Sequence, residues 1–181
     1  VEGACAGACL IKTQLLKAIG LFDDFFSTGY EDAELGLRAM LAGSKIMYAP
    51  RAVVTHKIGA SIDKIRDLGY AVRLQVNINY TYLKLMPVSV MIFNSPYIAV
   101  KTFALLTLPI IFMRWRLWSV QVLALWKTVK LLPLITVKRR EKRLCVLSSR
   151  EILGRQKSFF RYYLKYFFKY LINGQKTIFE R

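Results

Sequence analysis

The chain has 181 residues, of which 55% are hydrophobic and 22% are charged, and its formal net charge is +17. This composition excludes a disordered polymer, and the length allows one domain with a hydrophobic core. Residues 1–85 carry 10 Lys and Arg against 8 Asp and Glu (net +2), whereas residues 86–181 carry 18 against 3 (net +15). We therefore expect two segments of different character.

The first residues predict a strand followed by a short helix. Small residues lead into Cys9, Leu10 and Ile11, which we expect to form the strand. Thr13 can cap a helix that Gly20 would end. The chain begins with "VEGACAGACLI", which is typical of the inside of a sheet rather than of a signal peptide, so we expect an amino-terminal portion to precede it.

A second helix is predicted from Asp32 to Ala42, where Ala33, Leu37, Met40 and Leu41 recur at helical spacing. Gly43 follows at the position of a left-handed carboxyl-terminal cap. Two short β-prone runs follow, at residues 45–49 and 52–55. The alternation of helices and strands predicts an α/β layer structure.

The carboxylates of Glu31 and Asp32 open the second helix and have two interpretations. They could complement only the helix dipole, an effect of about 0.3–1 kcal/mol, or they could belong to an active site. His56 is equally open, because a lone histidine after a strand is either a hydrogen-bonded structural residue or a ligand.

Three stretches occur in a recognisable order: "GACLIKTQLLKAIGLFDDFF" from residue 7, "YEDAELGLRAMLAGSKIMYAPRAVVTH" from residue 30 and "GAS" from residue 59. Together they resemble the carboxyl-terminal half of the catalytic domain of family 2 glycosyltransferases, rhamnosyltransferase-like members in particular. The resemblance covers about residues 1–85. It implies a partial GT-A domain, an α/β fold that binds nucleotide-diphospho-sugars, followed by an α-helical, membrane-associated region at 86–181.

The resemblance also implies the chemistry. Members of this family are inverting transferases, and the Asp of their "ED" motif, here Asp32, is the general base that takes the proton of the acceptor hydroxyl. Glu31 points about 100° away around the helix, so we expect it to orient the loop or the acceptor. Glu34 stands where the family commonly has Asp, which leaves its role open.

The resemblance implies a divalent metal, Mg or Mn, that stabilises the departing nucleoside diphosphate. His56 is the candidate metal ligand, and Gly59 and Ser61 are candidate contacts to the nucleotide-sugar. The family's Asp-x-Asp segment has no counterpart in this sequence, so most metal ligands are expected in the missing amino-terminal half.

The second segment predicts membrane association. Between Lys84 and Arg114 the only charged residue is Lys101, and the best candidate span is 95–113. A single crossing would place the basic tail and the nucleotide-sugar site on opposite sides, although both favour the cytoplasmic face. We therefore favour a peripheral or re-entrant arrangement on that face, with a transmembrane hairpin that uses residues 117–137 as the second choice.

The tail combines basic and aromatic residues. Residues 137–143 contain five basic residues out of seven, and Ser148 with Glu151 predicts a capping box that opens a helix to about residue 172. The rings of this helix could pack on the first segment, lie at an anionic membrane surface, or stack on single-stranded nucleic acid. No nucleic acid is expected as a partner, because the sequence contains no recognisable nucleic-acid-binding module.

The sequence therefore predicts an enzyme, an inverting glycosyltransferase that is incomplete as this chain. It would move a hexosyl or rhamnosyl group from a nucleotide-sugar to a hydroxyl of a lipid-linked or cell-surface glycan. The alternative is a non-catalytic membrane-binding module that retains a degenerate transferase fold.

Overall fold

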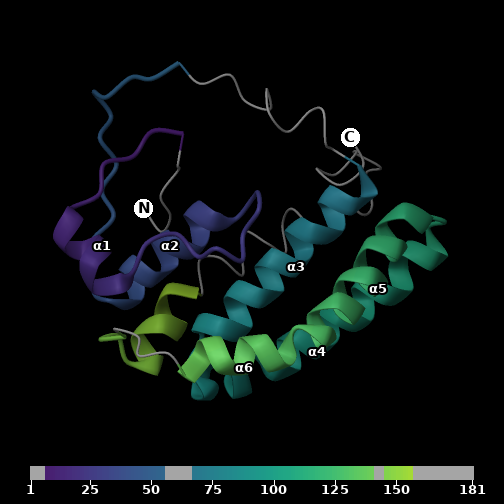
Figure 1. The fold of residues 1–181 in the computed structure, drawn as a ribbon. Helices are drawn as coiled ribbons and strands as arrows, with labels where there is room; N and C mark the ends of the chain where they lie inside the picture. Colours follow the sequence, from purple (N-terminus) through teal and green to yellow (C-terminus); the bar gives the residue numbers. More distant parts are fainter. Residues whose placement is uncertain (1–6, 56–66, 141–144, 157–181) are drawn as a thin grey trace.

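A computed structural model describes residues 7–55, 67–140 and 145–156, and every regular element in these ranges is a helix (Figure 1). A further helical segment covers residues 149–156. The helices are α1 (Thr13–Ile19), α2 (Glu31–Leu41), α3 (Leu68–Leu85), α4 (Val88–Ile111), α5 (Trp115–Lys130) and α6 (Leu132–Arg140).

The predicted α/β fold, a partial GT-A domain, is therefore wrong for the described residues. The three runs that were expected to be strands, at 9–11, 45–49 and 52–55, lie in non-helical segments without a strand partner in the described chain. Most of their apolar side chains are exposed, as Leu10 and Val53 show. A strand exists only when a neighbouring strand completes its backbone hydrogen bonds, so β-propensity alone did not make a sheet here.

The predicted glycine ends of the first two helices and the apolar spacing of α2 are confirmed, whereas the predicted Thr13 cap is wrong, because Thr13 is the first residue of α1 and no described side chain caps the helix. Gly20 follows α1 with a φ of 86°, and Gly43 follows α2 with a φ of 79°. The N–H of Gly20 donates to the carbonyl of Leu16, and the N–H of Gly43 donates to that of Met40. Both turns use a backbone conformation that glycine adopts without a steric penalty.

The three long helices lie side by side, with α5 packed against both α3 and α4 (Figure 1). The seam between α3 and α5 is formed by Ala71, Val72, Val76, Val120 and Ala124, all of which are buried. The side chains of the two alanines are single methyl groups, so the two helices can approach closely. This seam is one of two hydrophobic clusters in the described residues.

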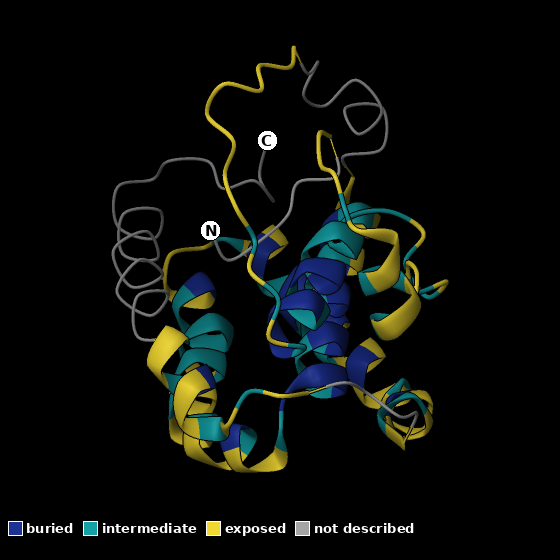
Figure 2. Cartoon of the chain, turned by 90° about the vertical axis from the view of Figure 1, so that its left-hand side faces the viewer, coloured by how far each residue is buried: buried dark blue, intermediate teal, exposed yellow. Residues whose placement is uncertain are grey.

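The other cluster joins α2 to the start of α4. It contains Met40 and Leu41 from the end of α2, Met86 and Val90 around the turn into α4, and Ile152 from the segment 149–156. Figure 2 shows that buried residues gather in the middle of the molecule, with exposed residues on the outer helices. Residues from both halves of the sequence therefore share one interior.

Helix α4 is long and apolar enough to cross a membrane, and it is the only single helix of the described chain that is. Helices α5 and α6 meet the same standard only as a pair, and they are bent by 55°. Pro96 and Pro109 lie inside α4 without ending it. The structure is thus compatible with membrane association, as the sequence predicted.

The capping box at Ser148 is confirmed. The N–H of Ser148 donates to Oε2 of Glu151 at 2.8 Å, and the N–H of Glu151 donates to the Ser148 hydroxyl at 3.3 Å. The Ser148 hydroxyl also donates to Oε2 of Glu151 at 2.6 Å, and this bond, together with the one from the Ser148 N–H, lowers the pKa of the Glu151 carboxyl. The remainder of the predicted helix, from residue 157 to about residue 172, lies outside the described residues.

The seam between α3 and α5 should be sensitive to the loss of even two methyl groups. Val120 is fully buried, so Val120→Ala should lower the free energy of unfolding by about 2 kcal/mol, because burial is lost and a cavity is left. Val129→Ala makes the same chemical change on the exposed side of the same helix and should change stability by less than about 0.5 kcal/mol. Urea unfolding followed by circular dichroism measures both, and equal effects would contradict the packing.

Candidate functional site

The acidic residues that open α2 follow a tight turn. Gly29 and Tyr30 both have positive φ, at 79° and 78°. The turn is held by α3, because the side-chain amide of Asn77 donates to the carbonyls of Gly29 (2.7 Å) and Thr28 (3.2 Å). A left-handed tyrosine costs about 1 kcal/mol, so the contacts around it must fix this conformation.

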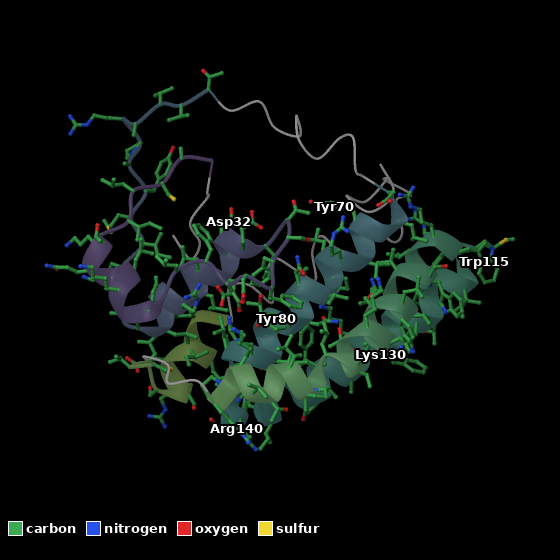
Figure 3. The ribbon with its side chains drawn as sticks, in the orientation of Figure 1. Asp32, Tyr70, Tyr80, Trp115, Lys130 and Arg140 are labelled. Atoms are coloured by element: carbon green, nitrogen blue, oxygen red, sulfur yellow. The ribbon has the colours of Figure 1, made fainter. Side chains whose placement is uncertain are left out.

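Asp32 lies in the first turn of α2 and is partly exposed. Its Oδ1 accepts the N–H of Ala33 at 2.7 Å. In Figure 3, Asp32 stands at the upper left, well apart from the row of Trp115, Lys130 and Arg140. The predicted base is therefore within reach of a ligand at the surface, at the end of a helix that favours negative charge.

Glu31 is partly exposed like its neighbour, but one of its carboxylate oxygens is enclosed. Its Oε2 is buried and accepts no hydrogen bond from any described residue. Burial and the charge of Asp32 raise the pKa of the nearby Tyr30 hydroxyl. A buried carboxylate oxygen without a hydrogen-bond donor is uncommon in folded proteins.

Glu34, the third acid of the segment, has a different environment. Its side chain is 0% exposed, and it accepts from two cations. Lys84 Nζ of α3 lies 2.7 Å from Oε1, while Arg38 Nε and Nη2 lie 2.9 Å and 2.8 Å from Oε2. Glu34 therefore joins α2 to α3 and is not available to a substrate.

Lys84 is shared between two carboxylates. It donates to Asp23 Oδ2 as well as to Glu34, and the side chains of Lys84 and Asp23 are only 6% and 5% exposed. Tyr80 donates its hydroxyl to the same Asp23 oxygen at 2.9 Å, and its ring stacks on Phe25 with centroids 3.8 Å apart. The loop before α2 is thus fastened to α3.

Arg38 extends this arrangement to α1. Its Nη1 donates to the carbonyls of Ile19 (2.7 Å) and Gly20 (3.1 Å), and its Nη2 donates to that of Leu21 (2.6 Å). We call Asp23, Glu34, Arg38 and Lys84 the buried charge network. Two acids balance two bases, which is the condition under which buried charges are tolerated.

A pocket of about 170 Å³ lies next to the network. Arg139 lines this pocket and donates a hydrogen bond to the backbone carbonyl of Leu83. Because Leu41, at the carboxyl end of α2, also lines it, the pocket is distinct from the surface around Asp32. Its lining residues are Arg38, Leu41, Lys84, Leu85, Met86, Pro87, Arg139 and Cys145.

The other predicted site residues, His56, Gly59 and Ser61, lie outside the described residues. In the part of the chain that the structure covers, no three His, Cys, Asp or Glu side chains converge in a way that could hold a metal ion. Asp32 and Glu31 are therefore the predicted site residues that the structure places, and no metal centre is built from the described side chains.

Comparisons with known proteins do not identify a family. No protein-family model, curated protein or solved structure matches this chain. The functional interpretation rests on the residues themselves.

Sequence reasoning missed the buried charge network. The sequence leaves the role of Glu34 open, and Lys84 only marks the beginning of the apolar stretch. One signal was present, because Glu34 and Arg38 are four residues apart and so share a face of the helix. The pairing with Lys84 spans 50 residues and has no local signature.

Acid should weaken the network through Asp23. Burial raises the pKa of this carboxyl, but hydrogen bonds from Lys84, the Phe25 N–H and Tyr80 outweigh burial, so the pKa lies well below its usual range. A lowered pKa in the folded state contributes stability above the unfolded value of about 3.9, and this contribution is lost as the pH falls further.

Asp23→Asn should therefore flatten the loss of stability below about pH 4 and lower stability at neutral pH. Asp24→Asn is the matched control, because the side chain of Asp24 is 93% exposed. Urea unfolding at a series of pH values measures both variants. An acid dependence in Asp23→Asn as steep as in the parent would show that Asp23 is not the titrating group.

Proposed function

We propose that this chain takes part in the transfer of a sugar from a nucleotide-sugar to a hydroxyl of a lipid-linked or cell-surface glycan, with Asp32 as the general base. The observation that carries the proposal is the position of Asp32. It is partly exposed at the amino end of α2, two residues before Glu34, which is locked into the interior. The order of the sequence motifs supports the same role. The proposal does not include a GT-A sheet, because the described residues form no strand.

The proposed reaction is a direct displacement. The acceptor oxygen attacks the anomeric carbon while the bond between that carbon and the diphosphate oxygen breaks. The electron pair of the broken bond leaves with the nucleoside diphosphate. The acceptor proton passes to a carboxylate oxygen of Asp32. Inversion follows, because the acceptor approaches from the side opposite the leaving group.

The neighbours of Asp32 suit a positioning role. The side chain of Glu31 as a whole is partly exposed beside Asp32, and a hydrogen bond to it from a second hydroxyl of the acceptor sugar would orient the sugar. The turn at Gly29 and Tyr30, held by Asn77, fixes the direction in which α2 begins. A nucleotide contact at Gly59 and Ser61, and a divalent metal at His56, remain part of the proposal.

A non-catalytic membrane-binding module is the second candidate function. The specific observation that favours it is α4, an apolar helix with most of its large side chains exposed. This candidate needs no donor site and no base. The two functions differ in what they predict for Asp32. Sugar transfer requires its carboxylate, whereas the membrane-binding module does not.

Asp32→Asn should lower sugar transfer by about 10²- to 10⁴-fold, because the amide cannot accept the proton. The full chain would be incubated with membrane vesicles that carry lipid-linked glycans and with radiolabelled uridine, guanosine and thymidine diphospho-sugars. Transfer is measured as label in the lipid-extracted fraction.

Asp24→Asn serves as the matched control, since it makes the same change at an exposed carboxylate. It should leave transfer unchanged, and both variants should unfold at the same urea concentration as the parent. Equal transfer by Asp32→Asn and the parent would remove Asp32 as the base. Transfer by the parent that Asp32→Asn lowers and Asp24→Asn leaves unchanged would exclude the non-catalytic module.

A further inference from the structure

The outer side of α4 is an apolar surface. Six of its exposed large apolar side chains share an arc of about 100° around the helix. No charged residue lies among them over the 24 residues of α4, which correspond to about 36 Å of length. We call this surface the outer arc; its members are Ile92, Phe93, Val100, Phe103, Ile110 and Ile111.

Asn94 and Lys101, which carry the amide and the charge of α4, lie on the opposite side. Val90 is fully buried there. Asn94, on the same side, donates to the Tyr82 hydroxyl (3.2 Å) and to Gln156 (2.9 Å). Lys101 shares this side and is partly buried. The rest of the protein therefore covers the polar side of α4, and the apolar side faces outward.

The packing of α4 decides its orientation against a bilayer. It lies along α5, and α5 lies along α3. Helix α3 carries an exposed Arg73 and is capped at its amino end by Asp67. An α4 that stood upright in a bilayer would take these charges into hydrocarbon, whereas an α4 that lies flat would keep α3 in water.

The outward side of α5 carries residues that are typical of proteins at the lipid headgroup layer. Arg116, Trp126, Lys127 and Lys130 are exposed, and Lys130 Nζ lies 3.7 Å from the centre of the Trp126 ring. Figure 3 shows Trp115 and Lys130 at the two ends of α5. Amphipathic rings and long basic side chains favour the boundary between lipid phosphates and acyl chains.

We infer that α4 is an in-plane membrane anchor: its outer arc enters the acyl region of an anionic bilayer, and the basic side chains of α5 contact lipid phosphates. The charge of residues 86–181, net +15 from 18 basic and 3 acidic residues, complements such a surface. The inference concerns lipid contact alone and does not depend on sugar transfer.

The depth of the outer arc tests this directly. Ile92, Phe103 and Ile110 lie near the start, middle and end of α4 on one line of the helix. Each would be replaced singly by Cys in the full chain with Cys5, Cys9 and Cys145 changed to Ser, and labelled with an environment-sensitive dye. The probe membranes are phosphatidylcholine vesicles with and without phosphatidylglycerol, containing acyl-chain quenchers at known depths.

An in-plane helix places all three labels at one shallow depth in the anionic vesicles, with weaker binding to the neutral ones. A label at Phe103 much deeper than those at Ile92 and Ile110 would overturn the inference in favour of a span. Absence of acyl quenching at all three positions, with or without self-association of the chain, would overturn it as well.

Matched variants test the affinity. Phe93→Ser removes an exposed ring from the outer arc and should weaken partitioning into anionic vesicles about tenfold. Phe22→Ser makes the same change at an exposed ring on the loop after α1 and should leave partitioning unchanged. Both are surface changes, and circular dichroism checks that the helices persist. Equal partitioning of the two variants would contradict a lipid contact by the outer arc.

Discussion

The ammonium group of Lys84 lies in the interior between Asp23 and Glu34, and the arrangement of the first three helices depends on it. A buried charge is tolerated only when its partners are held close, so each of the three side chains requires the other two. Lys84 belongs to α3, Glu34 to α2, and Asp23 to the loop between α1 and α2. One charge cluster therefore fixes two helices and the loop that precedes the candidate base.

The same scaffold separates the two proposed functional surfaces. The end of α2 packs through Met40 and Leu41 against Val90 at the start of α4, whereas Asp32 lies eight residues earlier, about 12 Å along the helix. A bilayer beneath α4 and a base at the opposite end of α2 would suit an acceptor hydroxyl on a glycan that extends away from the lipid surface. This geometry connects the two proposals, although each is tested by its own experiment.

Local signals in the sequence predicted local structure well. Apolar spacing with Gly20 and Gly43 identified α1 and α2 nearly to the residue, and the capping box at Ser148 formed as expected. The sheet prediction was wrong, because a strand depends on a partner that no local pattern specifies. The role of Glu34 could not be predicted for the same reason: Lys84 reaches it only after α3 has packed against α2. Asp32 and Glu31 were located correctly at the start of α2, while their chemical role remains a proposal.

A double-mutant cycle on Glu34 and Lys84 tests most directly whether this pair holds α2 against α3. Glu34→Gln, Lys84→Met and the double variant would be unfolded in urea with the parent under one set of conditions. Because both charges are buried and in contact, the interaction energy between the two positions should be at least about 1.5 kcal/mol, with the double variant less destabilised than the sum of the single ones. An interaction energy near zero would contradict the account.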